Sequence, residues 1–244
     1  MIQVAGNGLA FGSFQQCCYT YAFDSALVHR MTLHWVNILI HAAAGTAAII
    51  IGFYLLAKPK GPEAHRRQGK VFSFLGLVVC ATAALGLIVF RFLPLFSVIT
   101  LLVFYQLVSG WRVIYTKENG PNQYDAGFTL MTVLFSIQLI PIVLDQVDGS
   151  KIIVLSTFGA LVCVLIYDAI RWFFPHPWYR FLWRYEHSYK LLSSLFGMLS
   201  AFVGNTIRFG QPWSQIIPSM LGLMCIGYVF YKLYREDKRS WRNN

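Results

Sequence analysis

The chain has 244 residues, of which 57% are apolar and only 12% are charged, and its formal net charge is +10. This composition excludes an ordinary soluble domain, because such domains carry about 45–50% apolar and about 25% charged residues. The positive charge does not call for a nucleic-acid partner, since membrane proteins collect lysine and arginine in their cytoplasmic loops. The composition therefore predicts an α-helical membrane protein.

Seven stretches of the chain approach or exceed the roughly 20 apolar residues that a helix needs to cross a bilayer. They lie near residues 32–57, 71–90, 93–115, 126–147, 151–173, 188–208 and 213–234. The expected fold is an all-α, polytopic bundle of seven transmembrane helices. We expect residues 1–30 to form a short extracytoplasmic segment, 31–235 the seven-helix domain, and 236–244 a basic cytoplasmic tail. The alternative for the first segment is that Met31 is the natural start.

The orientation follows from the lysines and arginines, which short cytoplasmic loops retain and translocated loops lose. In the seven-span arrangement, all but four of the 20 lysines and arginines fall on one side of the membrane. The other side holds Arg30, Arg91, Lys151 and Arg208. The N-terminus is therefore predicted to lie outside and the C-terminus in the cytoplasm, where the basic tail meets anionic phospholipid headgroups.

The first span carries a histidine on a face of small residues. His41 shares its helical face with Gly45, Ala48 and Gly52, which lie four, seven and eleven residues further on. Small residues allow helices to approach closely, so this face is expected to be buried in the bundle. His41 is thus a candidate ligand residue in the outer half of the membrane. The alternative is a core histidine that binds no ligand.

A second histidine lies at the start of the next helix. The dipeptide Gly61-Pro62 is a typical helix start, because proline is tolerated in the first turn. A helix that begins there places His65 on one stripe with Gly69 and Phe72. His65 is therefore predicted to face the bundle just below the cytoplasmic surface, rather than to belong to a loop.

The next four spans bring further polar groups to one depth or along shared faces. Arg112 ends the third span, Asp125 opens the fourth, Asp168 ends the fifth and His187 opens the sixth. Asn205 lies further along the face of His187. Ionisable groups in spans are costly and usually point into the bundle. More hydroxyl and phenol groups share these faces: Tyr105, Ser109, Thr129, Thr132, Ser136, Thr157 and Ser194.

The first hypothesis for this set is a ligand or metal site at the cytoplasmic helix ends. His65, His187, Asp125 and Asp168 together are the residue types that bind a zinc-like ion. Such an ion with an open position could hydrolyse a lipid-like substrate, with Arg112 steadying an anionic group. The common short motifs of nucleotide-binding proteins and zinc hydrolases are absent from the sequence, so the type of enzyme, if any, stays open.

Three alternatives remain. The two histidines could ligate one b-type haem, a less favoured hypothesis because both lie at the membrane edge. The polar stripes could instead serve a small-molecule or proton-coupled transporter or a sensor. The structural alternative is that these charges only pair between helix ends, as Arg112–Asp125 and Arg171–Asp168.

Several stretches of the sequence carry a resemblance to a known family. They are HAAAG, LLAKPKGPEAHRRQGKVF, FYQLVSGWRVIYTKENGPNQYD, IYDAIRW and WRYEHSYKLLSSLFGMLSAFVGN, and together they span most of residues 38–205. The chain resembles an uncharacterised bacterial membrane family with a domain of unknown function and six to seven spans. Leu191 departs from the family pattern, where methionine is expected. The resemblance implies the bacterial cytoplasmic membrane as location and marks much the same polar residues, but it implies no activity.

Overall fold

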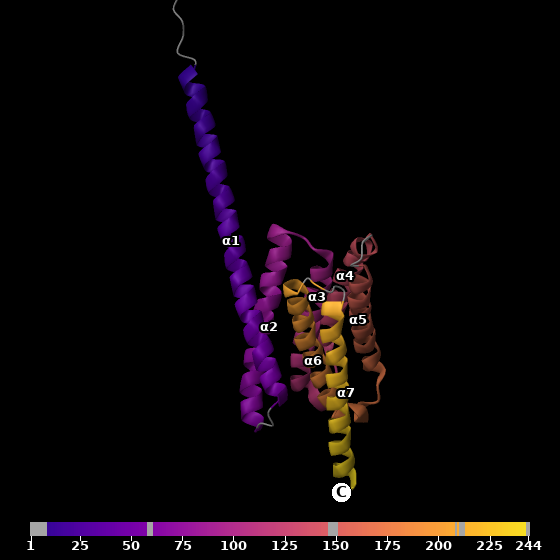
Figure 1. The fold of residues 1–244 in the computed structure, drawn as a ribbon. Coiled ribbons are helices and arrows are strands. Elements are labelled where there is room, and N and C mark those ends of the chain that lie inside the picture. The colour runs from indigo at the N-terminus through magenta and orange to yellow at the C-terminus, as the bar shows by residue number, and fades with distance from the viewer. Residues whose placement is uncertain (1–8, 58–60, 146–150, 208, 210–212, 243–244) are drawn as a thin grey trace, which may run out of the picture.

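The computed structural model describes residues 9–57, 61–145, 151–207, 209 and 213–242. Among them there is no β-strand, and seven long helices account for most of the chain (Figure 1). These are α1 (Leu9–Ala57), α2 (Pro62–Leu85), α3 (Pro94–Thr116), α4 (Gln123–Leu144), α5 (Lys151–Ile170), α6 (Tyr179–Thr206) and α7 (Trp213–Arg242). The shorter elements are a π-helical turn η1 (Gly86–Phe90) and the 3-10 turns η2 (Lys117–Asn119), η3 (Arg171–Phe173) and η4 (His176–Trp178). The predicted all-α class is confirmed.

Six of the seven long helices of the described chain are long and apolar enough to cross a membrane, and α6 is the exception. The chain is accordingly a multi-pass membrane protein. Length and composition support six crossings among the described residues, one fewer than the seven predicted. The physical reason lies in the position of α6, which packs against α3 on one side and α7 on another. A helix shielded by its neighbours can carry polar side chains toward them, and α6 buries Glu186, Lys190 and Ser194.

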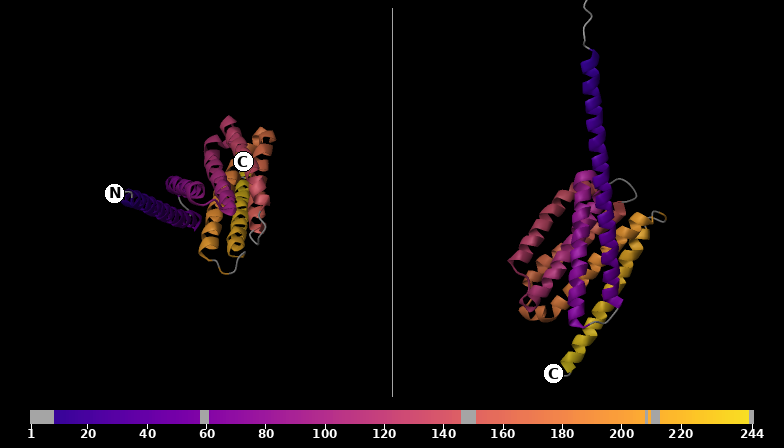
Figure 2. Two further views of the ribbon diagram at one scale, coloured as in Figure 1. Left: turned by 90° about the horizontal axis from the view of Figure 1, so that it is seen from above. Right: turned by 90° about the vertical axis from the view of Figure 1, so that its left-hand side faces the viewer.

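Helix α1 is much longer than a bilayer requires. Its 49 residues extend over about 73 Å at 1.5 Å per residue, against roughly 30 Å of hydrocarbon. The apolar span is limited to Arg30–Ala57. Figures 1 and 2 show the preceding part of α1 projecting beyond the bundle. The helix runs without a break through the predicted boundary at residue 30, while residues 1–8 lie outside the described chain.

The helix ends gather at two ends of the bundle. Helices α1, α3 and α5 end, and α2, α4 and α6 begin, at the end of the bundle where α7 finishes, and the first described residues of α1 lie at the other (Figure 1). We refer to the former as the basic end, because it presents Arg66, Lys70, Lys117 and Arg184. Helix α7 continues to Arg242, so most of the predicted basic tail is helical. Residues 243–244 of that tail lie outside the described chain.

Close helix crossings hold the bundle together. The main apolar core joins α1, α2, α3 and α6, and contains Ala48, Phe72, Leu107 and Leu195. The tightest crossing for the site is that of α3 and α6 at Gly110. A Cβ atom there would lie 2.7 Å from the Cβ of Lys190, so only glycine allows this approach.

Candidate functional site

The structure distributes the predicted site residues over separate places rather than one. His65 and His187 line a groove at the basic end. Arg112 and Asp125 pair at the turn between α3 and α4. Asp168 belongs to a buried cluster of charges between α3, α5 and α6.

Asp125 caps a helix rather than offering a free ligand oxygen. Its Oδ1 accepts from Arg112 Nε at 2.7 Å, and its Oδ2 accepts from the backbone N–H of Asn122 at 2.9 Å. The side chain of Asn122 accepts in return from the first turn of α4, which completes a capping box. The pairing of Arg112 with Asp125 that was considered as the structural alternative is therefore observed.

Asp168 is the centre of the buried ion cluster, by which we mean Asp168, Arg171, Glu186 and Lys190. Lys190 is 1% exposed and Asp168 is 4% exposed. The Nζ of Lys190 lies 2.7 and 2.8 Å from the two carboxylate oxygens of Asp168. Tyr105 donates a third hydrogen bond to Oδ2 at 2.5 Å. A carboxylate saturated in this way has no oxygen left for a metal ion.

The second half of the buried ion cluster lies between α5 and α6. Arg171 Nη1 is 2.5 Å from Glu186 Oε2 and 3.5 Å from Asp168 Oδ1. Tyr167 donates to the other oxygen of Glu186 at 2.7 Å, and Tyr179 donates to the backbone carbonyl of Arg171. Two acids and two bases cancel in formal charge, and their burial is tolerable only while acids and bases stay balanced.

Glu186 and Lys190 are site residues that were not predicted from the sequence. Lys190 was counted among the cytoplasmic loop charges, together with Arg171, although both are buried and paired. A signal was available, because Glu186, Lys190 and Ser194 recur every four residues and therefore share one helical face. Acidic and basic groups that alternate on one face of an apolar span indicate internal pairing.

A groove of about 680 Å³ lies at the basic end, and we call it the basic groove. It lies between the ends of α1, α2, α3, α6 and α7. Its basic and titratable side chains are His65, Arg66, Lys70, Lys117, His187 and Lys232. Its apolar wall includes Leu55, Phe72, Leu191, Leu192, Leu195 and Leu233. One space thus combines positive charge with hydrocarbon surface.

His187 is held in one orientation within the basic groove. Its Nδ1 lies 2.9 Å from the carbonyl oxygen of Gly110, and a carbonyl only accepts, so Nδ1 carries the hydrogen. The remaining ring nitrogen, Nε2, takes no part in this bond. The same crossing of α3 and α6 places Lys190, three residues further on, in the buried ion cluster. His65 also lines the groove, but it is exposed at the start of α2 and does not face the bundle interior as predicted.

His41 and Asn205 lie apart from both places. His41 Nδ1 is 2.9 Å from the hydroxyl of Thr82, which donates its own hydrogen to the backbone carbonyls of Val78 and Val79. His41 is therefore the donor, and this half-buried histidine ties α1 to α2. Asn205 is exposed near the end of α6.

The proposed four-residue metal site is not assembled. In the described part of the chain, no three histidine, cysteine, aspartate or glutamate side chains lie close enough together to hold a metal ion. The cause is local: Asp125 is engaged by Arg112 and Asp168 by Lys190, so neither carboxylate approaches the two histidines of the basic groove.

Comparison with protein-family models, with curated proteins and with solved structures finds no match to this chain. The resemblance to a bacterial membrane family stays a prediction. The function has to be inferred from the two polar places that the structure defines, the basic groove and the buried ion cluster.

Proposed function

We propose that this protein crosses the bacterial cytoplasmic membrane seven times, with its N-terminus outside, and binds an anionic phospholipid in the basic groove. The phosphate lies among the basic side chains and the first part of the acyl chains lies along the leucines. The observation that carries this proposal is the joining of a basic rim and an apolar wall in one space of about 680 Å³.

Charge complementarity favours an anionic headgroup. Arg66 and Lys70 come from α2, Lys232 from α7 and Lys117 from the turn η2, whereas Glu236 is the one acidic residue among the described residues that line the groove. Glu236 is already paired with Arg184, whose Nη2 lies 2.8 Å away. Lysine and arginine are common phosphate ligands, and basic pockets between helices on the cytoplasmic side bind anionic headgroups.

The apolar wall favours a lipid over a free phosphate ion. Leu55, Leu191 and Leu233 of the wall are half-buried and have apolar surface left for an acyl chain to cover, whereas Leu192 and Leu195 are already buried against the protein. Pockets for small ligands typically measure about 300–1,000 Å³. The basic groove therefore accommodates a headgroup and the upper part of its chains, while the rest of the lipid stays in the bilayer.

Native mass spectrometry of the purified protein tests this proposal, with phosphatidylglycerol and phosphatidylcholine offered at equal concentration. We expect phosphatidylglycerol to bind preferentially. The double variant Lys70→Ala/Lys232→Ala should weaken its binding about 30-fold, because each basic residue near the headgroup contributes about 1 kcal/mol. Arg91→Ala, at the opposite end of the bundle, is the matched control and should leave binding unchanged. Equal binding of both lipids, or an unaffected double variant, would refute the proposal.

A further inference from the structure

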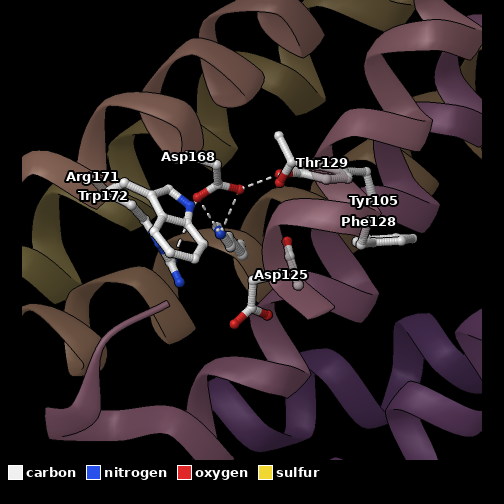
Figure 3. Close-up of a pocket in the computed structure, with 9 residues that line it drawn as sticks. Tyr105, Asp125, Phe128, Thr129, Asp168, Arg171 and Trp172 are labelled. Carbon is white, nitrogen blue, oxygen red and sulfur yellow. Dashed lines mark hydrogen bonds and ion pairs between the residues drawn. The ribbon is translucent and has the colours of Figure 1, made fainter. Parts of the chain in front are cut away.

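A second, much smaller space lies beside the buried ion cluster. Its volume is about 10 Å³, close to what a single water molecule occupies. Figure 3 shows Asp168 beside Arg171 and Trp172, with Thr129 on its other side and the carboxylate of Asp125 set apart. The cavity is bounded by both carboxylates, so it lies between the capped turn at the basic end and the buried cluster.

One polar atom in this wall has no partner. Ser109 is 8% exposed, lines the cavity, and its hydroxyl makes no hydrogen bond to any described residue. Buried hydroxyl groups are almost always hydrogen-bonded, either to protein or to ordered water. An unpaired hydroxyl facing a polar cavity of this size is the arrangement expected around a buried water molecule.

The neighbouring hydrogen bonds have a defined direction. Tyr105 donates its single hydrogen to Asp168, so in its 2.8 Å contact with Thr129 the threonine must be the donor. The oxygen of Thr129 is then left with lone pairs that can accept. The bonds therefore run from Thr129 through Tyr105 to Asp168, where Lys190 donates from the other side.

We infer that this cavity is a binding site for one water molecule, which hydrogen-bonds to Ser109 and Thr129 and joins the buried ion cluster to the Asp125 side of the bundle. The water gives the chain of Thr129, Tyr105 and Asp168 a route for proton exchange with the aqueous phase at the basic end. A proton passed from the water to Thr129 moves the hydroxyl hydrogen of Thr129 to Tyr105 and that of Tyr105 to Asp168. The carboxylate then holds one more proton, and the charge of the cluster is higher by one until the proton returns by the same route. This inference is independent of lipid binding in the basic groove.

Hydroxyl-radical footprinting of the intact protein tests the inference, because radicals form from bound water and modify the side chains next to it. We expect modification of Phe128, which lines the cavity, and its loss in Ser109→Val, which fills the space. The internal control is Phe158, which packs against the apolar cluster of Val98, Val143 and Val154. An unmodified Phe128 in the wild-type protein, or equal modification of Phe128 in Ser109→Val, would overturn the inference.

The thermal unfolding midpoint of Ser109→Ala gives a second test, because a hydrated cavity and a dry cavity predict shifts of the midpoint in opposite directions. If water is bound, alanine removes one of its partners and lowers the midpoint relative to Ser136→Ala. Ser136 is the matched control, since it is a buried serine whose hydroxyl already donates to Thr132 of its own helix. If the cavity were dry, alanine would remove an unpaired hydroxyl and raise the midpoint above that of the control, which would contradict the inference.

Discussion

At the scale of single residues, the pairing of Lys190 with Asp168 is the contact on which the buried ion cluster depends. Both groups are almost completely buried, and each satisfies the other with short hydrogen bonds. A buried pair of this kind adds little net stability compared with an apolar pair, but losing one partner is costly. Because losing one partner costs more than losing both, a double-mutant cycle can test the cluster.

Lys190→Met should lower the free energy of unfolding by about 3–5 kcal/mol, because Asp168 is left as a buried charge with less compensation. Methionine keeps the stem that packs against Gly110. The double variant Lys190→Met/Asp168→Leu should recover most of this loss, since the remaining Arg171–Glu186 pair is still neutral. Denaturant unfolding in detergent measures both, and a double variant no more stable than Lys190→Met would contradict the pairing.

The matched surface control is Arg184→Ala. Arg184 pairs with Glu236 and Asp237 at 2.8 and 2.7 Å, but its side chain is 33% exposed. Exposed ion pairs typically contribute about 0–1 kcal/mol, so this substitution should have a small effect on the free energy of unfolding.

At the scale of elements, the crossing of α3 and α6 positions residues of both the basic groove and the buried ion cluster. Gly110 accepts from His187 on the groove side and contacts the stem of Lys190 on the cluster side. Any side chain at residue 110 must push the two helices apart, because the atom it meets is a Cβ next to the backbone. The geometry of the groove and that of the cluster are therefore linked through one residue.

Gly110→Ala should destabilise the protein by about 1–3 kcal/mol, the usual cost of overpacking a tight contact. It should also weaken phosphatidylglycerol binding, because His187 loses its fixed orientation. Gly159→Ala is the opposite case: nothing lies within 4 Å of its added Cβ, and alanine is the better helix former by about 1 kcal/mol. If thermal unfolding shows Gly110→Ala to be as stable as Gly159→Ala, the crossing is not as tight as described.

The elements also show how far sequence reasoning reaches. The α-helical class, the start of α2 at Pro62 and the place of His65 on that helix follow from composition and helical spacing, although His65 is exposed rather than turned into the bundle. The separation of Asp125 and Asp168 from His65 and His187 could not be predicted in this way. Helical spacing places residues at the same depth in the membrane, but it does not say which helices are neighbours in the bundle. The role of Lys190 was missed since a charge near a predicted span end looks the same whether it meets water or a buried partner.

At the scale of the whole molecule, α6 decides the topology. With seven crossings, the α5–α6 and α6–α7 connections lie on opposite sides of the membrane, whereas six crossings without α6 put them on the same side. Figure 1 shows α6 running the length of the bundle beside the other helices. The proposed orientation puts Phe173 in the cytoplasm and Phe209 outside, and both are strongly exposed.

Single cysteines at these two positions test the arrangement in a variant whose 5 native cysteines have been replaced. A membrane-impermeant thiol reagent added to the outside of intact bacterial cells, with its access to the periplasm established, should label Phe209→Cys but not Phe173→Cys. Labelling of both positions, or of Phe173→Cys alone, would contradict seven crossings with the N-terminus outside. Disrupted cells, in which both cysteines should react, are the control for reactivity.

The most direct test of lipid binding is an electron cryo-microscopy structure of the protein in nanodiscs that contain phosphatidylglycerol. We predict density for one phosphate within hydrogen-bonding distance of the basic side chains of the groove, continuing as acyl chain along Leu55, Leu191 and Leu233. A groove closed by its own side chains, or filled equally by phosphatidylcholine in nanodiscs of that lipid alone, would contradict the proposed function.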